Sequence, residues 1–172
     1  MHLDMPIEQL VRRTDTHFQM GFATEARERV PRSEEFALQP SRDGLLVLAR
    51  NEQGLRAPVE LLREAYGPRL DVRDPRVRLI GGVQVKEPIM HVRISLQVRF
   101  LDAVARAMLG RGAAPEEEYA RGRHCVLRYE APLADLLGLH HELARVTEGT
   151  ARHWIALSHY ALVTRDPGGN AA

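Results

Sequence analysis

The chain is poor in cysteine. Among 172 residues only Cys125 carries a thiol, so an internal disulfide framework is excluded. No base stands at a spacing that would activate this thiol, and we therefore interpret Cys125 as a small core residue rather than as a nucleophile.

Long apolar runs are also missing. No segment approaches the length that crosses a bilayer, and the first residues lack the apolar centre of a signal peptide, so we expect a cytoplasmic protein without a membrane partner. A net charge of +1 gives no global field that would draw the chain onto nucleic acid. The length and the 44% share of hydrophobic residues are those of a globular protein with a sizeable core.

Lysine is almost absent, since Lys86 is the single example and arginine supplies every other basic residue. Codon bias in a GC-rich genome accounts for such a ratio. Its physical consequence remains, because arginine brings planar, bidentate recognition of phosphate to any surface patch that it forms.

Sequence spacings typical of a metal or catalytic site are missing as well. Neither H-E-x-x-H nor C-x-x-C occurs among the eight histidines and the one cysteine. His140 and His141 are adjacent, so they point in different directions on a helix. His153 and His159 are expected on one face of a strand but far apart. We predict no catalytic residue, no metal site and no cofactor.

The N-terminal part gives weak signals. Residues 1–15 suggest a short amphipathic helix, and the alternation over Thr16–Phe22 suggests a strand. Thr24–Pro40 is charged and contains two prolines, which indicates a surface connection with at most a short helix at its start.

The middle of the chain predicts a βαβ unit. Leu45–Ala49 is typical of a strand, Leu55–Tyr66 of a helix that ends at Gly67-Pro68, and residues 70–80 of strand material interrupted by Asp74-Pro75. Gly81-Gly82 is the best candidate for a domain boundary.

The C-terminal part predicts six elements in a clear order. They are a strand over Glu87–Ile94, a helix over Arg99–Leu109, a polar edge strand or loop over Ala113–Arg121, a strand over Val126–Ala131, a helix from Pro132 to Glu148-Gly149, and a strand over Trp154–Val163.

Several motifs in this part carry a family resemblance. Glu87-Pro88-Ile89-Met90, the segment Ala131–Gly138, Thr147-x-Gly149 and His159-Tyr160 resemble, in order and spacing, motifs of domain V of elongation factor G. The resemblance covers Val85–Val163. It implies a ferredoxin-like βαββαβ domain of the kind that translational GTPases dock near the ribosomal stalk base and the sarcin–ricin loop.

A second, partial resemblance precedes it. Arg63–Gly67 and Asp74–Val77 are similar to segments of domain III of elongation factor G, whereas Asn51–Leu55 does not reproduce the G-E-L-H turn of that domain. An unrelated βαβ piece is the alternative.

The predicted fold class is therefore α+β, with a ferredoxin-like (βαββαβ) C-terminal domain and a smaller βαβ-containing N-terminal region. We place the N-terminal region at 1–82, the ferredoxin-like domain at 83–165 and a flexible tail at 166–172.

The sequence lacks the phosphate-binding loop G-x-x-x-x-G-K-[ST], so the GTPase engine of the family that it resembles is expected to be absent. We expect a non-catalytic docking module, either a stand-alone paralogue or the tail of a degenerate factor.

Two surfaces are candidates for binding. The resemblance implies that the first helix of the domain and its loops face the ribosome, which gives a cluster of arginines; a solvated charged face is the ordinary alternative. The cluster is Arg99, Arg106, Arg111, Arg121 and Arg123.

Strand alternation defines the second surface, the sheet face away from the helices. An aromatic ring among arginines is typical of single-stranded RNA binders, but the aromatics of the RNP1 pattern are missing. We expect the N-terminal half to pack here and to bury Trp154. The residues of this face are His91, Arg93, His124, Arg128, Trp154 and Tyr160.

The expected partner is the ribosome, through its RNA or its stalk-base proteins. The alternative is a ferredoxin-like regulatory domain that makes no RNA contact and forms a homodimer through its bare sheet.

Overall fold

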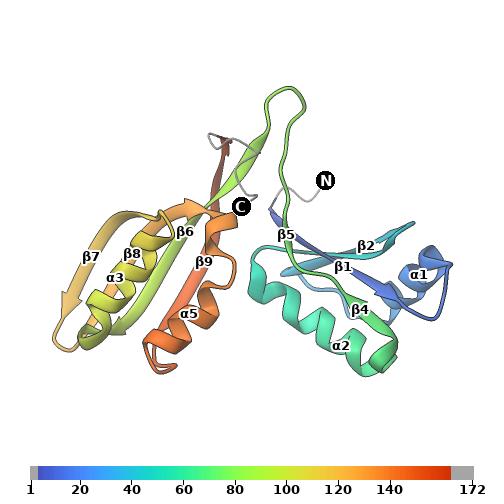
Figure 1. The fold of residues 1–172 in the computed structure, drawn as a ribbon, viewed down its shortest axis with the longest axis horizontal. Helices are drawn as coiled ribbons and strands as arrows, with labels where there is room; N and C mark the ends of the chain where they lie inside the picture. The colour runs from blue at the N-terminus through green and yellow to red at the C-terminus, as the bar shows by residue number, and fades with distance from the viewer. Residues whose placement is uncertain (1–3, 164–172) are drawn as a thin grey trace, which may run out of the picture. The chain divides into compact units, whose positions relative to one another are not determined.

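The computed structural model describes residues 4–163, which belong to two compact units, Met1–Arg78 and Leu79–Ala172 (Figure 1). The predicted tail at 166–172 lies outside the described residues. No helix within residues 4–163 is long and apolar enough to span a bilayer. Where the domains end, including the predicted boundary at Gly81-Gly82, stays a prediction.

The N-terminal unit has a βαββαβ order, with an additional short strand. Its antiparallel sheet runs β2-β3-β1-β4, and β5 also pairs with β1. The elements are β1 (Ile7–Arg13), α1 (Gln19–Arg29), β2 (Phe36–Ser41), β3 (Gly44–Ala49), η1 (Glu52–Leu55), α2 (Arg56–Tyr66), η2 (Gly67–Arg69), β4 (Leu70–Val72) and β5 (Arg76–Val77).

Residues 4–22 differ from the prediction, and the first three residues of the expected helix lie outside the described part of the chain. The expected helix over residues 1–15 is the strand β1, and the expected strand over Thr16–Phe22 is a turn followed by α1. Ile7 and Val11 are both fully buried, and a spacing of four fits one face of a strand as well as one face of a helix. Residues 7–13 form a strand because they pair with β3 on one side and with β4 on the other.

The segment expected to be a surface connection also forms regular structure. It contains most of α1 and the strand β2, which pairs with β3 at the edge of the sheet. Pro40 is tolerated there because an edge strand can leave a backbone N–H position without a sheet partner.

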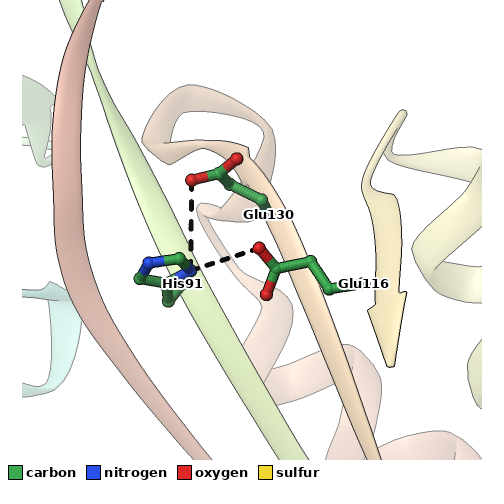
Figure 2. Close-up of side chains that lie close together, drawn as sticks. All are labelled: His91, Glu116 and Glu130. Carbon is green, nitrogen blue, oxygen red and sulfur yellow. Dashed lines mark ion pairs between the residues drawn. The ribbon is translucent and has the colours of Figure 1, made fainter. Parts of the chain in front are cut away.

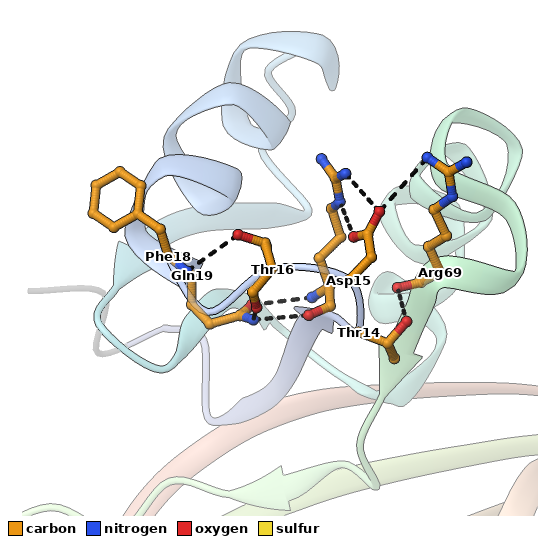
Figure 3. A network of polar contacts seen from close by, with 7 residues as sticks. Thr14, Asp15, Thr16, Phe18, Gln19 and Arg69 are labelled. Atoms are coloured by element: carbon orange, nitrogen blue, oxygen red, sulfur yellow. Dashed lines mark hydrogen bonds and ion pairs between the residues drawn. The ribbon is translucent and has the colours of Figure 1, made fainter.

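A polar network closes the link from β1 to α1 (Figure 3). The buried side chain of Gln19 accepts a hydrogen bond from Arg13 N at 3.0 Å and donates to Arg13 O at 2.8 Å and to Thr16 O at 2.7 Å. Asp15 pairs with Arg13 at 2.6 Å and with Arg69 at 3.6 Å. The ion pairs and the amide together tie the start of α1 to the ends of β1 and η2.

The predicted helix over Leu55–Tyr66 is confirmed as η1 and α2. Leu55, Val59 and Leu62 are buried at helical spacing. The helix ends at Gly67, whose positive φ of 57° is a backbone angle that glycine adopts without the steric cost of a side chain.

The C-terminal unit is ferredoxin-like, as predicted, with an antiparallel sheet in the order β7-β8-β6-β9. Its helices lie on one face of this sheet (Figure 1). The elements are β6 (Lys86–Gln97), η3 (Val98–Phe100), α3 (Leu101–Gly110), β7 (Ala114–Arg121), β8 (His124–Pro132), α4 (Leu133–Leu136), α5 (Leu139–Val146) and β9 (Arg152–Leu162).

Strict alternation along β6 and β8 builds the core of this unit. Met90, Val92 and Ile94 are buried, while His91 and Arg93 between them are exposed. Cys125 and Leu127 on β8 follow the same rule. One face of the sheet therefore packs on the helices, and the other carries polar side chains.

The single helix predicted after Pro132 is two helices. Gly138, at φ 74°, interrupts the segment between α4 and α5. Arg111 spans the break: it pairs with Glu142 at 2.6 Å and donates hydrogen bonds to the carbonyl oxygens of Asp135 at 2.6 Å and Leu137 at 3.0 Å. The carbonyl groups at the end of a helix lack intrahelical hydrogen-bond donors, and the guanidinium of Arg111 supplies donors to these two.

The Thr147-x-Gly149 motif ends α5. The buried hydroxyl of Thr147 donates to Leu143 O at 2.6 Å and accepts from Ala151 N at 3.2 Å. Gly149 has φ 73° and donates its N–H to Ala144 O, so the motif turns the chain into β9.

Candidate functional site

The open face of the C-terminal sheet carries the polar side chains of four neighbouring strands. Because residues that pair across an antiparallel sheet point to the same face, the register arranges these side chains in rows. Two rows lie next to each other in the middle of the sheet, one basic and aromatic, the other containing histidine and glutamate.

The first row runs from β7 to β9 through four paired residues, Glu117, Arg128, Arg93 and Trp154. Arg128 forms an ion pair of 2.8 Å with Glu117. Arg93 lies between a second arginine and the indole of Trp154. The row therefore contains the guanidinium of Arg128, whose charge is paired with Glu117, the guanidinium of Arg93, and the aromatic ring of Trp154.

The second row is centred on the pair His91 and Glu130, which face each other on β6 and β8. His91 Nδ1 lies 3.5 Å from Glu116 Oε1 and 3.9 Å from Glu130 Oε1 (Figure 2). His159 approaches the same Glu130 oxygen with its Nδ1 at 3.5 Å. Two imidazoles and two carboxylates thus gather on one part of the face.

Two β-bulges bring the outer members of this cluster into place. On β7 the register shifts between Pro115 and Glu117, which leaves Glu116 as the extra residue. On β9 the register shifts opposite Ile89 and Met90, and His159 pairs with Ile89 on the open face. Bulges commonly turn a side chain out of its regular position in this way.

The bulge on β9 corrects two expectations from simple alternation. Tyr160 pairs with Pro88, which has the parity of the buried residues, so Tyr160 leaves the open face to which it was assigned. His153 pairs with Ile94 on the helix side, and His153 and His159 therefore lie on opposite faces instead of one.

The expectation that Trp154 is buried is wrong. Its side chain is 59% exposed because it stands on the sheet face that the helices of its own unit leave uncovered. It lines a shallow hollow together with five other residues, four of which belong to the two rows. They are His91, Val92, Arg93, Glu116 and Arg128.

His124, the last of the residues assigned to this face, lies at the start of β8 and is exposed. It pairs with Gln97 and Arg121, away from the His91 cluster by six residues of the strand. The structure therefore brings His91, Arg93, Arg128 and Trp154 together and leaves His124 apart.

The five arginines predicted to bind the ribosome divide into two groups. Arg111 is half-buried, and its guanidinium is engaged with Glu142 and two carbonyl groups of its own unit. Arg99 and Arg123 line one hollow at the end of the β7–β8 hairpin, beside Val98 and Gly122.

Arg99 stacks on Phe100, with 4.4 Å from its guanidinium carbon to the ring centre, and lies 3.4 Å from Glu148. Arg106 is exposed on α3 and bonds the backbone oxygen of Asp102 one turn earlier. Arg121 is exposed at the end of β7. The exposed cationic groups thus gather around the start of α3 and the tip of the hairpin.

Cys125 is buried in the core of the sheet, as the sequence suggested. Burial, and secondly the charge of Glu118, raises the pKa of its thiol. A raised thiol pKa disfavours the thiolate, which does not suit a nucleophile.

The histidines of α5 form a separate group. The rings of His140 and His141 have centres 5.3 Å apart, and His140 lies 5.5 Å from His153 on β9. Glu116 and His159, by contrast, are functional candidates that the sequence reasoning missed, because only the two bulges direct them to His91 and Glu130.

Comparison with known families shows what the C-terminal unit is similar to. The family described as "Elongation factor G C-terminus" matches residues 84–169, which is half of the chain. The match covers every strand and helix of the C-terminal unit that the structure describes.

Comparison with solved structures includes the N-terminal unit. The crystal structure of the protein ttk003000868 from Thermus thermophilus is similar with a TM-score of 0.66 and 13% sequence identity, over 93% of this chain. At this identity the likeness shows the fold alone. The present chain spans 41% of the length of that protein.

Proposed function

Since the chain belongs to the elongation factor G C-terminus family, we propose that it acts as a non-catalytic, translation-factor-like module that binds the ribosome. The proposal implies a cytoplasmic location. Phosphate-bearing ribosomal RNA is the partner that its exposed arginines suit best, because guanidinium groups recognise phosphate through paired hydrogen bonds.

The observation that carries the proposal is the hollow lined by Arg99 and Arg123. Arg99 belongs to the turn that leads into α3, and Arg123 to the β7–β8 hairpin, so two separate elements direct arginines to one place. Val98 N donates to Arg123 O at 2.9 Å and fixes the hairpin tip beside the start of the helix. A backbone that is already fixed at both arginines lowers the entropy cost of bringing their side chains to one phosphate.

Arg106 and Arg121 extend this basic surface, whereas Arg111 does not contribute to it. The glutamates of β7 reduce the positive electrostatic potential around this basic surface. One of them, Glu117, is already paired with Arg128 on the open face of the sheet. The binding surface that we propose therefore consists of Arg99, Arg106, Arg121 and Arg123.

Co-sedimentation with ribosomes at increasing salt tests the proposal. We expect binding to fall steeply with salt concentration, because each phosphate contact releases bound counterions. Arg106→Glu and Arg123→Glu should each weaken binding and lower the slope of log K against log salt by about one.

Arg63→Glu is the matched control. Arg63 is an exposed helical arginine in the N-terminal unit, outside the proposed surface, and its reversal should leave the slope unchanged. A salt-independent interaction, or equal losses in all three variants, would contradict the proposal. Self-association without ribosome binding would favour a dimerisation domain instead.

A further inference from the structure

We propose that His91, Glu116 and Glu130 form a binding site for one divalent transition-metal ion, with His159 as the residue that positions Glu130. This inference concerns the open sheet face and does not depend on the proposed ribosome binding, which uses the α3 side and the hairpin tip.

Geometry is the first support. One ligand atom from each of the three residues lies within 4.8 Å of the other two. Ligands around Zn²⁺ stand about 2.0–2.2 Å from the ion, so they lie roughly 3–3.5 Å apart. The distance of 3.5 Å from His91 Nδ1 to Glu116 Oε1 already fits, and the distance of 3.9 Å from His91 Nδ1 to Glu130 Oε1 must shorten by less than about 1 Å.

The three residues come from three adjacent strands, β6, β7 and β8, so the sheet itself holds the ligands together. His91 and Glu130 face each other in regular register. Glu116 joins them through the bulge on β7, and His159 joins from the opposite edge through the bulge on β9. The bulges of the two edge strands thus direct Glu116 and His159 to the same part of the open face.

Charge is the second support. Glu116 and Glu130 are two carboxylates at close range, and histidines are the ion-pair partners that they have within residues 4–163. Glu117, next to them on β7, has Arg128 instead. The two carboxylates repel each other, and a bound divalent cation would offset this repulsion.

The donor set selects the class of ion. Imidazole nitrogen with carboxylate oxygen suits Zn²⁺ and its first-row neighbours, whereas Mg²⁺ and Ca²⁺ prefer oxygen ligands alone. Three protein ligands on an exposed face leave further positions to water. His91 and Glu116 also line the hollow that contains Trp154.

His159 has a different role. Its Nδ1 is 3.5 Å from the Glu130 oxygen that faces His91, and it shares a hydrogen bond of 2.9 Å with Ser158 Oγ. A partner that holds a ligating carboxylate in place tunes affinity without binding the ion, and its loss typically costs about 10–100-fold.

Titration of the untagged full chain with Zn²⁺ tests the site, with calorimetry for stoichiometry and Trp154 fluorescence as a local reporter. Trp154 is the only tryptophan and lies in the same hollow. We expect one Zn²⁺ per chain with a change in fluorescence. Mg²⁺ at the same concentration should not compete. Binding should weaken at acidic pH, because a protonated imidazole cannot ligate.

Variants distinguish this site from other histidines. His91→Ala and Glu130→Gln should abolish the 1:1 binding, and His159→Ala should weaken it about tenfold. His124→Ala, an exposed histidine on the same strand as Glu130, and Glu118→Gln, a glutamate near Glu116, should leave binding unchanged. All these side chains are at least partly exposed, and circular dichroism confirms the fold of each variant.

Three outcomes would overturn the proposal. They are the absence of Zn²⁺ binding at micromolar concentration, 1:1 binding that survives in both His91→Ala and Glu130→Gln, and loss of binding only in a His140→Ala/His153→Ala variant. The last result would assign the ion to the histidines of α5 and β9. Ribosome co-sedimentation is read separately, so failure of one proposal leaves the other to its own test.

Discussion

The two units of this chain share a strand order and differ in what their sheets present. β3 and β8 occupy equivalent positions, each beside the first strand of its unit. β3 reads Gly-Leu-Leu-Val-Leu-Ala and is buried at five of its six positions, whereas β8 alternates between buried and polar residues. At this position of the shared topology, the C-terminal unit therefore presents polar side chains on the open face where the N-terminal unit presents apolar ones, and the candidate site lies on that open face.

The units also differ in how their irregular segments are held. In the N-terminal unit, the neutral amide of Gln19 satisfies backbone groups at the link from β1 to α1. In the C-terminal unit, the charged Arg111 satisfies backbone carbonyls at the break between α4 and α5. Both anchors are half-buried or buried side chains that replace missing backbone hydrogen bonds.

Removal of the charged anchor should have the largest effect. Arg111→Ala takes away a partly buried ion pair and two hydrogen bonds to carbonyl groups, and leaves Glu142 without its partner. We expect the free energy of unfolding to fall by about 3 kcal/mol in urea denaturation. Arg106→Ala, an exposed arginine of α3, is the control, with a loss of less than about 0.5 kcal/mol. Equal losses of stability in the two variants would contradict the view that the contacts of Arg111 stabilise the fold.

Removal of the neutral anchor should cost less. Gln19→Ala deletes three hydrogen bonds to the backbone around Arg13 and Thr16, and we expect a loss of about 2 kcal/mol by the same measurement. The exposed Gln39 on β2 is the control, and Gln39→Ala should change stability by less than about 0.5 kcal/mol. A larger loss for Gln19→Ala than for Arg111→Ala would reverse the comparison of the two anchors.

The C-terminal unit could be predicted largely from the sequence because two signals agree there: the alternation of apolar and polar residues along the strands, and the proline and glycine residues at the ends of the helices. Met90, Val92 and Ile94 mark one face of β6, Pro132 marks a helix start, and Gly149 marks a turn. The N-terminal unit lacks this agreement. Ile7 and Val11 fit a helix and a strand equally well, and only the partners β3 and β4, far along the chain, decide between them.

The candidate site shows where sequence patterns fail. His91, Arg93 and Trp154 follow regular alternation, and their common face was predictable. Glu116 and His159 were not, because a bulge adds one residue to a strand and leaves no mark in a pattern of period two. Arg111 was assigned to the surface because its half-buried partners depend on the helix break at Gly138, which the apolar spacing of the segment conceals.

Acidification should separate the contribution of the Asp15 ion pairs from that of the neighbouring Gln19 amide. Of the three predicted changes in stability, we expect this one to be the smallest. The hydrogen bond from Arg13 is the main cause that lowers the pKa of Asp15 below 3.8. The carboxylate therefore contributes stability that is present above that value and lost as the pH falls through the lower pKa of the folded state. The melting temperature of Asp15→Asn should lie below that of the unmodified chain at pH 7. The difference should shrink as the solution is acidified below about pH 4 and vanish below the lower pKa of the folded state. Asp43→Asn, at an exposed turn, should show no such pH dependence. A deficit for Asp15→Asn that persists unchanged at about pH 3 would mean that Asp15 acts through its shape and hydrogen bonds, as Gln19 does, and not through its charge.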